Sequence, residues 1–289
     1  MNNDKVFEVE KKGKVTIITT SNNKYVLKDD NRDNKFYEYL NTRGFNNFPK
    51  IYSIDSSKLV MEYIDSKDIP VEQKLEDMVY LVSILHLSTM FDKKVDLDFI
   101  KEIYENIMKK QDYLMEYYLN LQNVIEEEIY MSPANYLLIR NISLIYLAIN
   151  YSKKYLDKFY DLVKDQTSFR YSYVHGNLNI NHLLEKDSLY LISWDKSRLD
   201  LPIYDLVDFY RKNHEDIDLD KIFNIYEKKV PLKKEEKYLL ISLLLIPDEI
   251  SSKDEYLKTK EVSNMIFYIE GLLDYLKNYS KESNNNTYK

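Results

Sequence analysis

The chain has 289 residues, and its 44% of hydrophobic residues suffice for a sizeable core in one large domain or two lobes. It contains no Cys, which excludes a disulfide framework, a thiolate metal site and a Cys nucleophile. With 41 Lys and Arg against 48 Asp and Glu, the net charge is −7, so the basic excess typical of nucleic-acid-binding proteins is missing.

Glycine is scarce, and the four glycines (Gly13, Gly44, Gly176 and Gly271) do not form a Walker or dinucleotide-binding fingerprint. The first ten residues are charged and lack the apolar core of a signal peptide. The most apolar run, residues 238–247, is too short to span a membrane. We therefore expect a cytoplasmic protein with no membrane span and no nucleic-acid partner.

The first 65 residues have the composition of a small β-rich lobe. Short segments rich in Val, Ile, Thr and Tyr predict strands over 6–10, 14–20 and 24–28, separated by turn sequences. Helical spacing over 33–43 stops at Gly44, and two more apolar runs follow at 49–54 and 58–64. The sequence predicts five strands and one helix.

From Val71 onward the apolar spacing is helical, and this pattern predicts a large lobe over residues 66–279. A hairpin interrupts it at 171–195, with predicted strands over 171–175 and 189–194. The last residues, 280–289, form a polar tail. The fold class is therefore α+β with two lobes. His86 lies in an apolar helix stripe and is expected to be a core histidine.

Two blocks near the centre of the chain carry the strongest motifs. The first is Val174-His175-Gly176-Asn177-Leu178, with His182 five residues after Asn177. The second is Ile192-Ser193-Trp194-Asp195, followed by Tyr204-Asp205-Leu206. Taken alone, the first block also fits an ordinary structural hairpin. Together they resemble the protein-kinase-like fold of aminoglycoside phosphotransferases and choline kinases, a family that uses ATP and Mg²⁺.

The resemblance covers nearly the whole chain. It implies that Lys28 contacts the nucleotide phosphates, that Glu38 is the ion-pair partner of Lys28, and that Glu62 and Tyr63 lie in the interlobe hinge. Without the resemblance, Lys28 is an ordinary exposed strand-end lysine. Of the two roles that the resemblance offers, we favour a retained structural ion pair with Glu38 over a working phosphate contact. Within the superfamily the chain is most similar to bacterial spore coat CotS-like proteins, which implies a spore-coat location and protein partners in a coat or its assembly.

Three positions depart from the family pattern. The family reads His-Gly-Asp-Leu, with Asn five residues after the Asp, and then Ile-Asp-Trp; this chain has Asn177, His182 and Ser193 at the base and the two metal positions. Asn177 cannot act as a base, and an imidazole and a hydroxyl are weak ligands for Mg²⁺. His175 is expected to order the loop, and Asp205 to cap a helix and brace the loop.

Asp195 offers a replacement for the lost metal carboxylate. It follows Ser193 by two residues on a predicted strand, so the two side chains are expected to share a face. Three functions remain open. The first is a pseudokinase-type or coat-associated protein that binds a nucleotide or small molecule and protein partners. The second is an active ATP-dependent phosphotransferase that uses Asp195 for Mg²⁺, and the third is a structural coat component without a ligand.

Overall fold

The structure is a computed structural model that describes residues 5–29, 34–55 and 58–285. Contacts divide the chain into two compact units. The first unit comprises Met1–Phe91, Arg170–Lys212 and Asn224–Val230, and the second comprises Asp92–Phe169, Asn213–Phe223 and Pro231–Lys289. The segment with the central motifs thus groups with the small sheet, although the sequence assigns it to the helical lobe.

Within the described residues, the elements of the first half of the chain are β1 (Val6–Lys12), β2 (Val15–Thr20), β3 (Lys24–Asp29), α1 (Asn34–Thr42), β4 (Ile51–Asp55), β5 (Lys58–Glu62), α2 (Val71–Thr89), β6 (Phe91–Lys94), α3 (Leu97–Glu126) and α4 (Pro133–Val163). The second half has β7 (Ser168–Val174), the 3₁₀ turn η1 (Ile180–His182), β8 (Leu183–Glu185), β9 (Leu189–Leu191), the 3₁₀ turn η2 (Trp194–Lys196), β10 (Arg198–Asp200), α5 (Ile203–Asn213), α6 (Leu219–Tyr226), α7 (Lys234–Leu244) and α8 (Glu255–Asn285).

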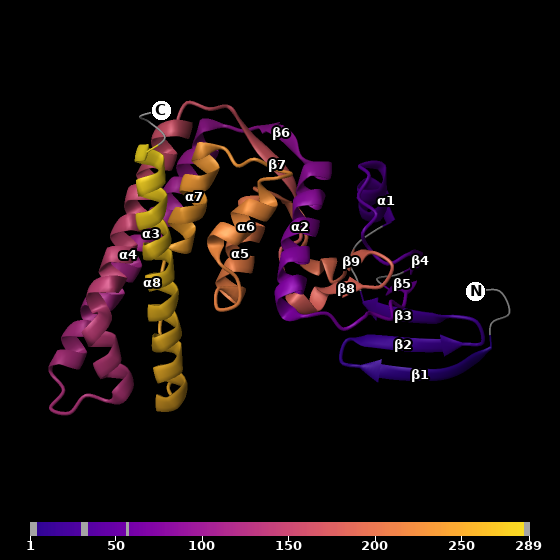
Figure 1. Cartoon of the computed structure of the whole chain (residues 1–289), viewed down its shortest axis with the longest axis horizontal. Helices are drawn as coiled ribbons and strands as arrows, with labels where there is room; N and C mark the ends of the chain where they lie inside the picture. The colour runs from indigo at the N-terminus through magenta and orange to yellow at the C-terminus, as the bar shows by residue number, and fades with distance from the viewer. Residues whose placement is uncertain (1–4, 30–33, 56–57, 286–289) are drawn as a thin grey trace. The chain divides into compact units, whose positions relative to one another are not determined.

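The described part of the first unit contains a five-stranded antiparallel sheet in the order β1-β2-β3-β5-β4 (Figure 1). The long side chains of Leu40 and Phe45 are fully buried in this unit, and Leu59 is 1% exposed. Gly44 follows α1 with φ +83°, a left-handed conformation that glycine adopts without strain. These observations confirm the predicted α+β fold with a small antiparallel lobe.

The predicted hairpin over 171–195 is wrong in its pairing. Strand β7 pairs with β10, where Val174 lies opposite Arg198, and β8 pairs with β9, where Leu183 lies opposite Leu191. The Leu183-Leu184 pair, which the sequence treats as a return to the core, forms a strand of its own. The loop after β7 is therefore held between two short ladders instead of at the tip of one hairpin.

The second unit is built from long helices. Helix α4, with 31 residues, packs against α3, α7 and α8, and Figure 1 shows α3, α4 and α8 side by side. Gln111 Nε2 on α3 donates to Ser152 Oγ on α4 at 2.8 Å, in the buried contact between these two helices.

Helix α8 continues through Asn285, so the predicted tail is helical to that point, and 286–289 lie outside the described residues. No helix in the described ranges is long and apolar enough to cross a membrane.

Candidate functional site

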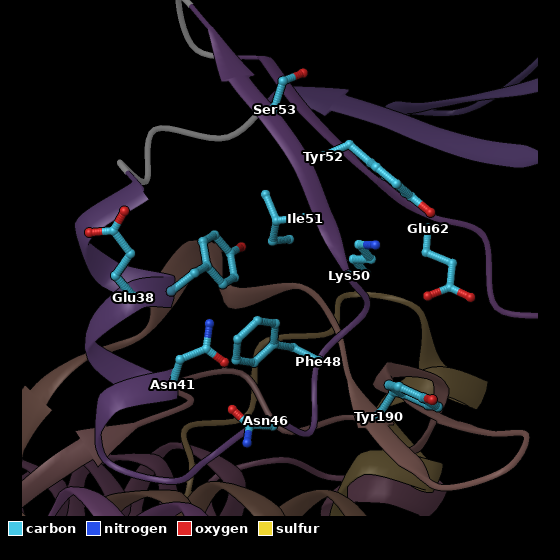
Figure 2. A pocket seen from close by; sticks show the side chains of 11 residues that line it. Glu38, Asn41, Asn46, Phe48, Lys50, Ile51, Tyr52, Ser53, Glu62 and Tyr190 are labelled. Atoms are coloured by element: carbon cyan, nitrogen blue, oxygen red, sulfur yellow. The ribbon is translucent and has the colours of Figure 1, made fainter. Parts of the chain in front are cut away.

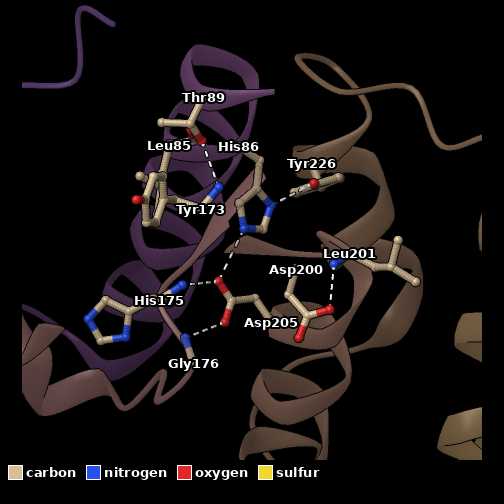
Figure 3. A network of polar contacts seen from close by, with 10 residues as sticks. All are labelled: Leu85, His86, Thr89, Tyr173, His175, Gly176, Asp200, Leu201, Asp205 and Tyr226. Carbon is tan, nitrogen blue, oxygen red and sulfur yellow. Dashed lines mark hydrogen bonds and ion pairs between the residues drawn. The ribbon is translucent and has the colours of Figure 1, made fainter. Parts of the chain in front are cut away.

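The loop that follows β7 is fixed by a single carboxylate. Asp205, in the first turn of α5, is 1% exposed. Its Oδ2 accepts the backbone N–H of His175 at 2.6 Å, and its Oδ1 accepts the backbone N–H of Gly176 at 2.8 Å (Figure 3). Two adjacent amides that point at one carboxylate fix the direction of the chain at that point. The prediction that Asp205 holds the loop is therefore confirmed, and it does so by accepting hydrogen bonds from two backbone N–H groups of the loop.

His86 and Tyr226 complete this network, and sequence reasoning missed their part in it. His86 Nε2 lies 3.1 Å from Asp205 Oδ2, and His86 Nδ1 lies 2.7 Å from the Tyr226 hydroxyl. His86 is fully buried, as expected of a core histidine. A histidine in an apolar helix stripe needs buried hydrogen-bond partners, and this requirement could have indicated from the sequence that His86 belongs to a polar network. Burial, the largest single effect, acts to raise the pKa of Asp205, but the hydrogen bond and charge of His86, the charge of His175 and the backbone N–H of Gly176 together hold the pKa below its usual range.

His175 orders the loop through its ring. Its Nε2 donates to the carbonyl of Ile192 at 2.9 Å, and its ring centroid lies 5.0 Å from that of Trp194. Trp194 is 2% exposed and donates Nε1–H to the carbonyl of Leu191 at 3.1 Å. These contacts tie the loop after β7 to the segment that contains Ser193.

His182 forms a hydrogen bond with the backbone of Asn177, the residue at the position that the resemblance assigns to the catalytic base. His182 Nδ1 lies 2.9 Å from the carbonyl oxygen of Asn177. A carbonyl only accepts, so Nδ1 carries the proton, and Nε2 keeps a lone pair in the neutral ring. Burial lowers the pKa of His182 below its usual range, and the nearby ammonium of Lys212 acts in the same direction. The imidazole is therefore neutral at pH 7.

Lys28 pairs with Asp195 and not with the predicted partner Glu38. Lys28 Nζ donates to Asp195 Oδ1 at 2.8 Å; the Lys28 side chain is 10% exposed and that of Asp195 is 56% exposed. Glu38 lies on the exposed side of α1 and lines a separate pocket. The segment after β9 thus brings a carboxylate to the lysine that the resemblance assigns to nucleotide phosphates.

The predicted strand through Ser193 and Asp195 is also wrong. Ser193 has φ +67° and ψ +54°, and it is the single non-glycine residue with positive φ in the described ranges. Asp195 lies in η2, so the two side chains do not share a strand face. A left-handed conformation at a residue other than glycine costs about 1–2 kcal/mol, and such positions are concentrated at functional sites.

The residues present do not suit Mg²⁺. His182 and Ser193 offer a neutral nitrogen and a hydroxyl, whereas Mg²⁺ prefers carboxylate and water oxygens. The nearby carboxylate of Asp195 is already engaged by Lys28. In the part of the chain that the structure describes, no group of three or more His, Asp and Glu is arranged to hold a metal ion.

The two predicted hinge residues lie at the end of strand β5 and immediately after it. Glu62 ends β5 opposite Tyr25, and its backbone N–H donates to the carbonyl of Lys50 at 2.9 Å. Tyr63 donates its backbone N–H to the carbonyl of Lys24 at 3.2 Å, and Lys24 Nζ lies 5.4 Å from the Tyr63 ring centroid. These contacts fix the chain where it leaves the sheet.

No family model and no curated protein matches the sequence. Among solved structures, the chain is similar to an aminoglycoside phosphotransferase from Alicyclobacillus acidocaldarius, with a TM-score of 0.73, 10% identity and coverage of 97% of this chain and 93% of that one. The fold is that of aminoglycoside phosphotransferases. A spectinomycin phosphotransferase in complex with AMP has a TM-score of 0.53, 14% identity and 93% coverage of both chains. A choline kinase from Streptococcus pneumoniae gives a TM-score of 0.49 at 20% identity, with coverage of 93% of this chain and 94% of that one.

In the aminoglycoside phosphotransferase fold, Lys28, Asn177, His182 and Ser193 keep the order along the chain that the resemblance requires. The contacts above bring Lys28 together with Asp195, and Asn177 together with His182. They do not bring Glu38 to Lys28. The backbone around the loop is thus held by buried contacts, and Asn177, His182 and Ser193 stand where the resemblance expects Asp, Asn and Asp.

Proposed function

We propose that the protein is a pseudokinase-type member of this fold, which binds a nucleotide at Lys28 without transferring its γ-phosphate. Asn177 stands at the base position and has no carboxylate to accept a proton from an acceptor hydroxyl. His182 and Ser193 replace the metal ligands with weaker ones. The bound nucleotide then serves to order the site for contacts with other proteins.

The observation that carries the proposal is the ion pair between Lys28 and Asp195. Lys28 is nearly buried, and its ammonium holds one carboxylate that is itself half exposed. A nucleotide phosphate is a stronger multi-oxygen acceptor and competes with that carboxylate for the ammonium. In this proposal Asp195 occupies the place of the phosphate beside Lys28 when no nucleotide is bound. Glu62 and Tyr63, at the hinge, line the end of the site that receives the nucleobase. Glu38, away from Lys28, does not contact the nucleotide.

The test compares ADP affinity, measured by isothermal titration calorimetry without Mg²⁺, in Asp195→Asn, Lys28→Met and the parent chain. Removal of the competing charge raises the affinity of Asp195→Asn about two- to fivefold, the range of an exposed ion pair. Lys28→Met loses a charge-assisted hydrogen bond and binds about tenfold more weakly or worse. Asp187→Asn, an exposed change in the turn between β8 and β9, is the matched control and leaves affinity unchanged.

A second candidate function, an active phosphotransferase that uses Asp195 for Mg²⁺, is favoured by the same contact, because it brings a carboxylate beside Lys28. It predicts the opposite sign: Asp195→Asn weakens nucleotide binding, and does so only when Mg²⁺ is present. That result, or Mg²⁺-dependent transfer of phosphate to a small alcohol at kinase rates, would overturn the pseudokinase proposal.

A ligand-free coat component is the third outcome of the same titration. In that case saturating ATP, ADP and GTP leave the melting temperature unchanged, whereas a ligand at 100 times its Kd adds about 2.7 kcal/mol to the free energy of unfolding. The spore-coat role rests on the sequence resemblance alone, and the location of the coding gene among sporulation genes is the observation that bears on it.

A further inference from the structure

The first unit contains a pocket that neither Lys28 nor the loop after β7 lines. Its volume is about 530 Å³, and Figure 2 shows it between helix α1 on one side and strand β4 on the other. The residues that line it include Tyr37, Asn41, Asn46, Phe48, Ile51 and Ser53. Neither the loop after β7 nor the Lys28–Asp195 pair contributes to it, and of the residues in the proposed nucleotide site Glu62 alone also lines this pocket.

Strand β4 is at the edge of the sheet. In the order β1-β2-β3-β5-β4 it pairs with β5 alone among the described strands, and Ile51, Tyr52 and Ser53 of this strand line the pocket. The outer side of an edge strand presents N–H and C=O groups that can pair with another extended chain. A binding pocket that runs along such an edge offers backbone pairing and side-chain recognition together.

The floor of the pocket is aromatic and its rim is polar. Tyr37 and Phe48 are 4% and 7% exposed, with ring centroids 5.2 Å apart. Asn41 and Asn46 are exposed on the rim, where their amides can donate and accept. Figure 2 shows the ring of Phe48 among the side chains that line the pocket, on the same side as Ile51. This floor fits one apolar side chain of a ligand.

The charges on the rim favour a basic partner. Two carboxylates, Glu38 and Glu62, line the pocket against one ammonium, Lys50, which also lies 5.4 Å from the Tyr52 ring centroid. Since side chains alternate along a strand, residues two apart in an added strand point to the same face. In such an added strand, a large apolar residue can therefore reach the aromatic floor while a basic residue two positions away reaches the acidic rim.

We propose that this pocket is a docking site for an extended segment of a partner protein, which adds a strand to the edge of β4. The segment places an aromatic side chain over Tyr37 and Phe48 and a Lys or Arg, two residues away, beside the carboxylates. Backbone pairing along β4 supplies affinity, and the pocket selects the sequence.

The probe is a pool of fluorescein-labelled heptapeptides with Phe and Lys fixed two positions apart and the other positions varied among Thr, Val and Ser. The immobilised full chain selects peptides from the pool, and fluorescence anisotropy then measures the best one. We expect that peptide to lose affinity about tenfold when two alternate amides are N-methylated, because two donors to the strand are removed. Replacement of its Lys by Glu also weakens binding.

Two variants on the same helix localise the site. Asn41→Trp adds a ring at the rim and is expected to reduce peptide affinity about tenfold or more. Lys35→Trp adds the same ring on α1 at an exposed position that does not line the pocket, and binding is unchanged. Equal urea midpoints for the two variants show that both are folded.

Three results would overturn the proposal. Selection of no peptide above the background of the Asn41→Trp chain removes the docking site. Binding that is insensitive to N-methylation assigns the pocket to a ligand held by side chains alone, such as a small molecule. Dimerisation of the chain in light scattering, abolished by Asn41→Trp, assigns the edge of β4 to a second copy.

Discussion

At the scale of single residues, Asp205 does most to define the site. One buried carboxylate accepts two consecutive backbone amides of the loop and also contacts His86. Burying a charge is costly unless the charge is paired and hydrogen-bonded, and these three contacts offset much of that cost. The loop keeps its shape through this residue, whatever side chain follows Gly176.

Asp205→Asn tests that role. The amide group presents N–H where the carboxylate accepted one, so at least one buried donor loses its partner, and the free energy of unfolding falls by about 2–4 kcal/mol. Asp208→Asn, on the same helix, removes only the surface pair with Lys212, at 2.7 Å, and changes stability by about 0.5 kcal/mol or less. Urea unfolding of both variants measures the difference, and equal midpoints would show that Asp205 does not hold the loop.

The sequence predicted that Asp205 holds the loop, but it did not predict all the residues that Asp205 contacts. Asp205 was found because the motif that contains it resembles a known pattern. The partner of Lys28 was not found, since Asp195 is 167 residues away and nothing local distinguishes it from Glu38. The contact of Tyr226 with His86 spans 140 residues and has the same cause. Long-range pairs between polar side chains depend on packing, which a single sequence does not encode in any periodic pattern.

At the scale of elements, the loop after β7 lies against the backbone of η2 and β10. Gly176 has φ +75°, and a Cβ atom at this position would overlap the carbonyl oxygen of Lys196 and lie 3.1 Å from Arg198 Nη1. The glycine therefore allows a close approach between two backbone segments as well as a left-handed turn. This contact places Asn177 at the end of β7.

Gly176→Ala should be among the most destabilising small changes in the chain. The overlap with a backbone oxygen and the positive φ together cost about 3 kcal/mol or more. Gly271→Ala is the matched control, because Gly271 lies in α8 with open space around it, and alanine there should stabilise the helix by up to about 1 kcal/mol. Thermal unfolding compares the two. A shift of the same sign in both variants would contradict the close approach.

Sequence patterns predicted the regular elements well and the irregular ones poorly. Alternation and turn composition gave the small sheet, and helical spacing gave α2, α3 and α4, because buried faces impose those periods. Residues 189–194 have the composition of one strand, but the strand ends at Leu191 and Ser193 turns left-handed. Trp194, the next residue, is anchored by its hydrogen bond to the carbonyl of Leu191, and the sequence composition contains no sign of the turn beside it.

At the scale of the whole molecule, the three departures from the family pattern lie in three different segments. Asn177 follows β7, His182 ends η1, and Ser193 precedes η2. The contacts of Asp205, His175 and Trp194 hold the segments of Asn177 and Ser193 without using the side chains of these two residues. The backbone N–H of Ile192 donates to the carbonyl of His182 at 3.0 Å and holds the third segment. The positions at which this chain departs from the motifs of the resemblance therefore lie in backbone segments that contacts of other residues hold in place.

This separation predicts that metal-dependent nucleotide binding can be restored. The triple variant Asn177→Asp, His182→Asn and Ser193→Asp returns oxygen ligands that Mg²⁺ prefers, and Asp tolerates a left-handed backbone well. We expect Mg²⁺ to raise its ADP affinity by about tenfold or more, while the parent chain shows no response to Mg²⁺. The control carries Asn in place of Asp at positions 177 and 193, so that it matches the size without the charge. Isothermal titration with and without Mg²⁺ makes the comparison. If the triple variant and this control respond alike to Mg²⁺, carboxylates at positions 177 and 193 do not supply a metal site.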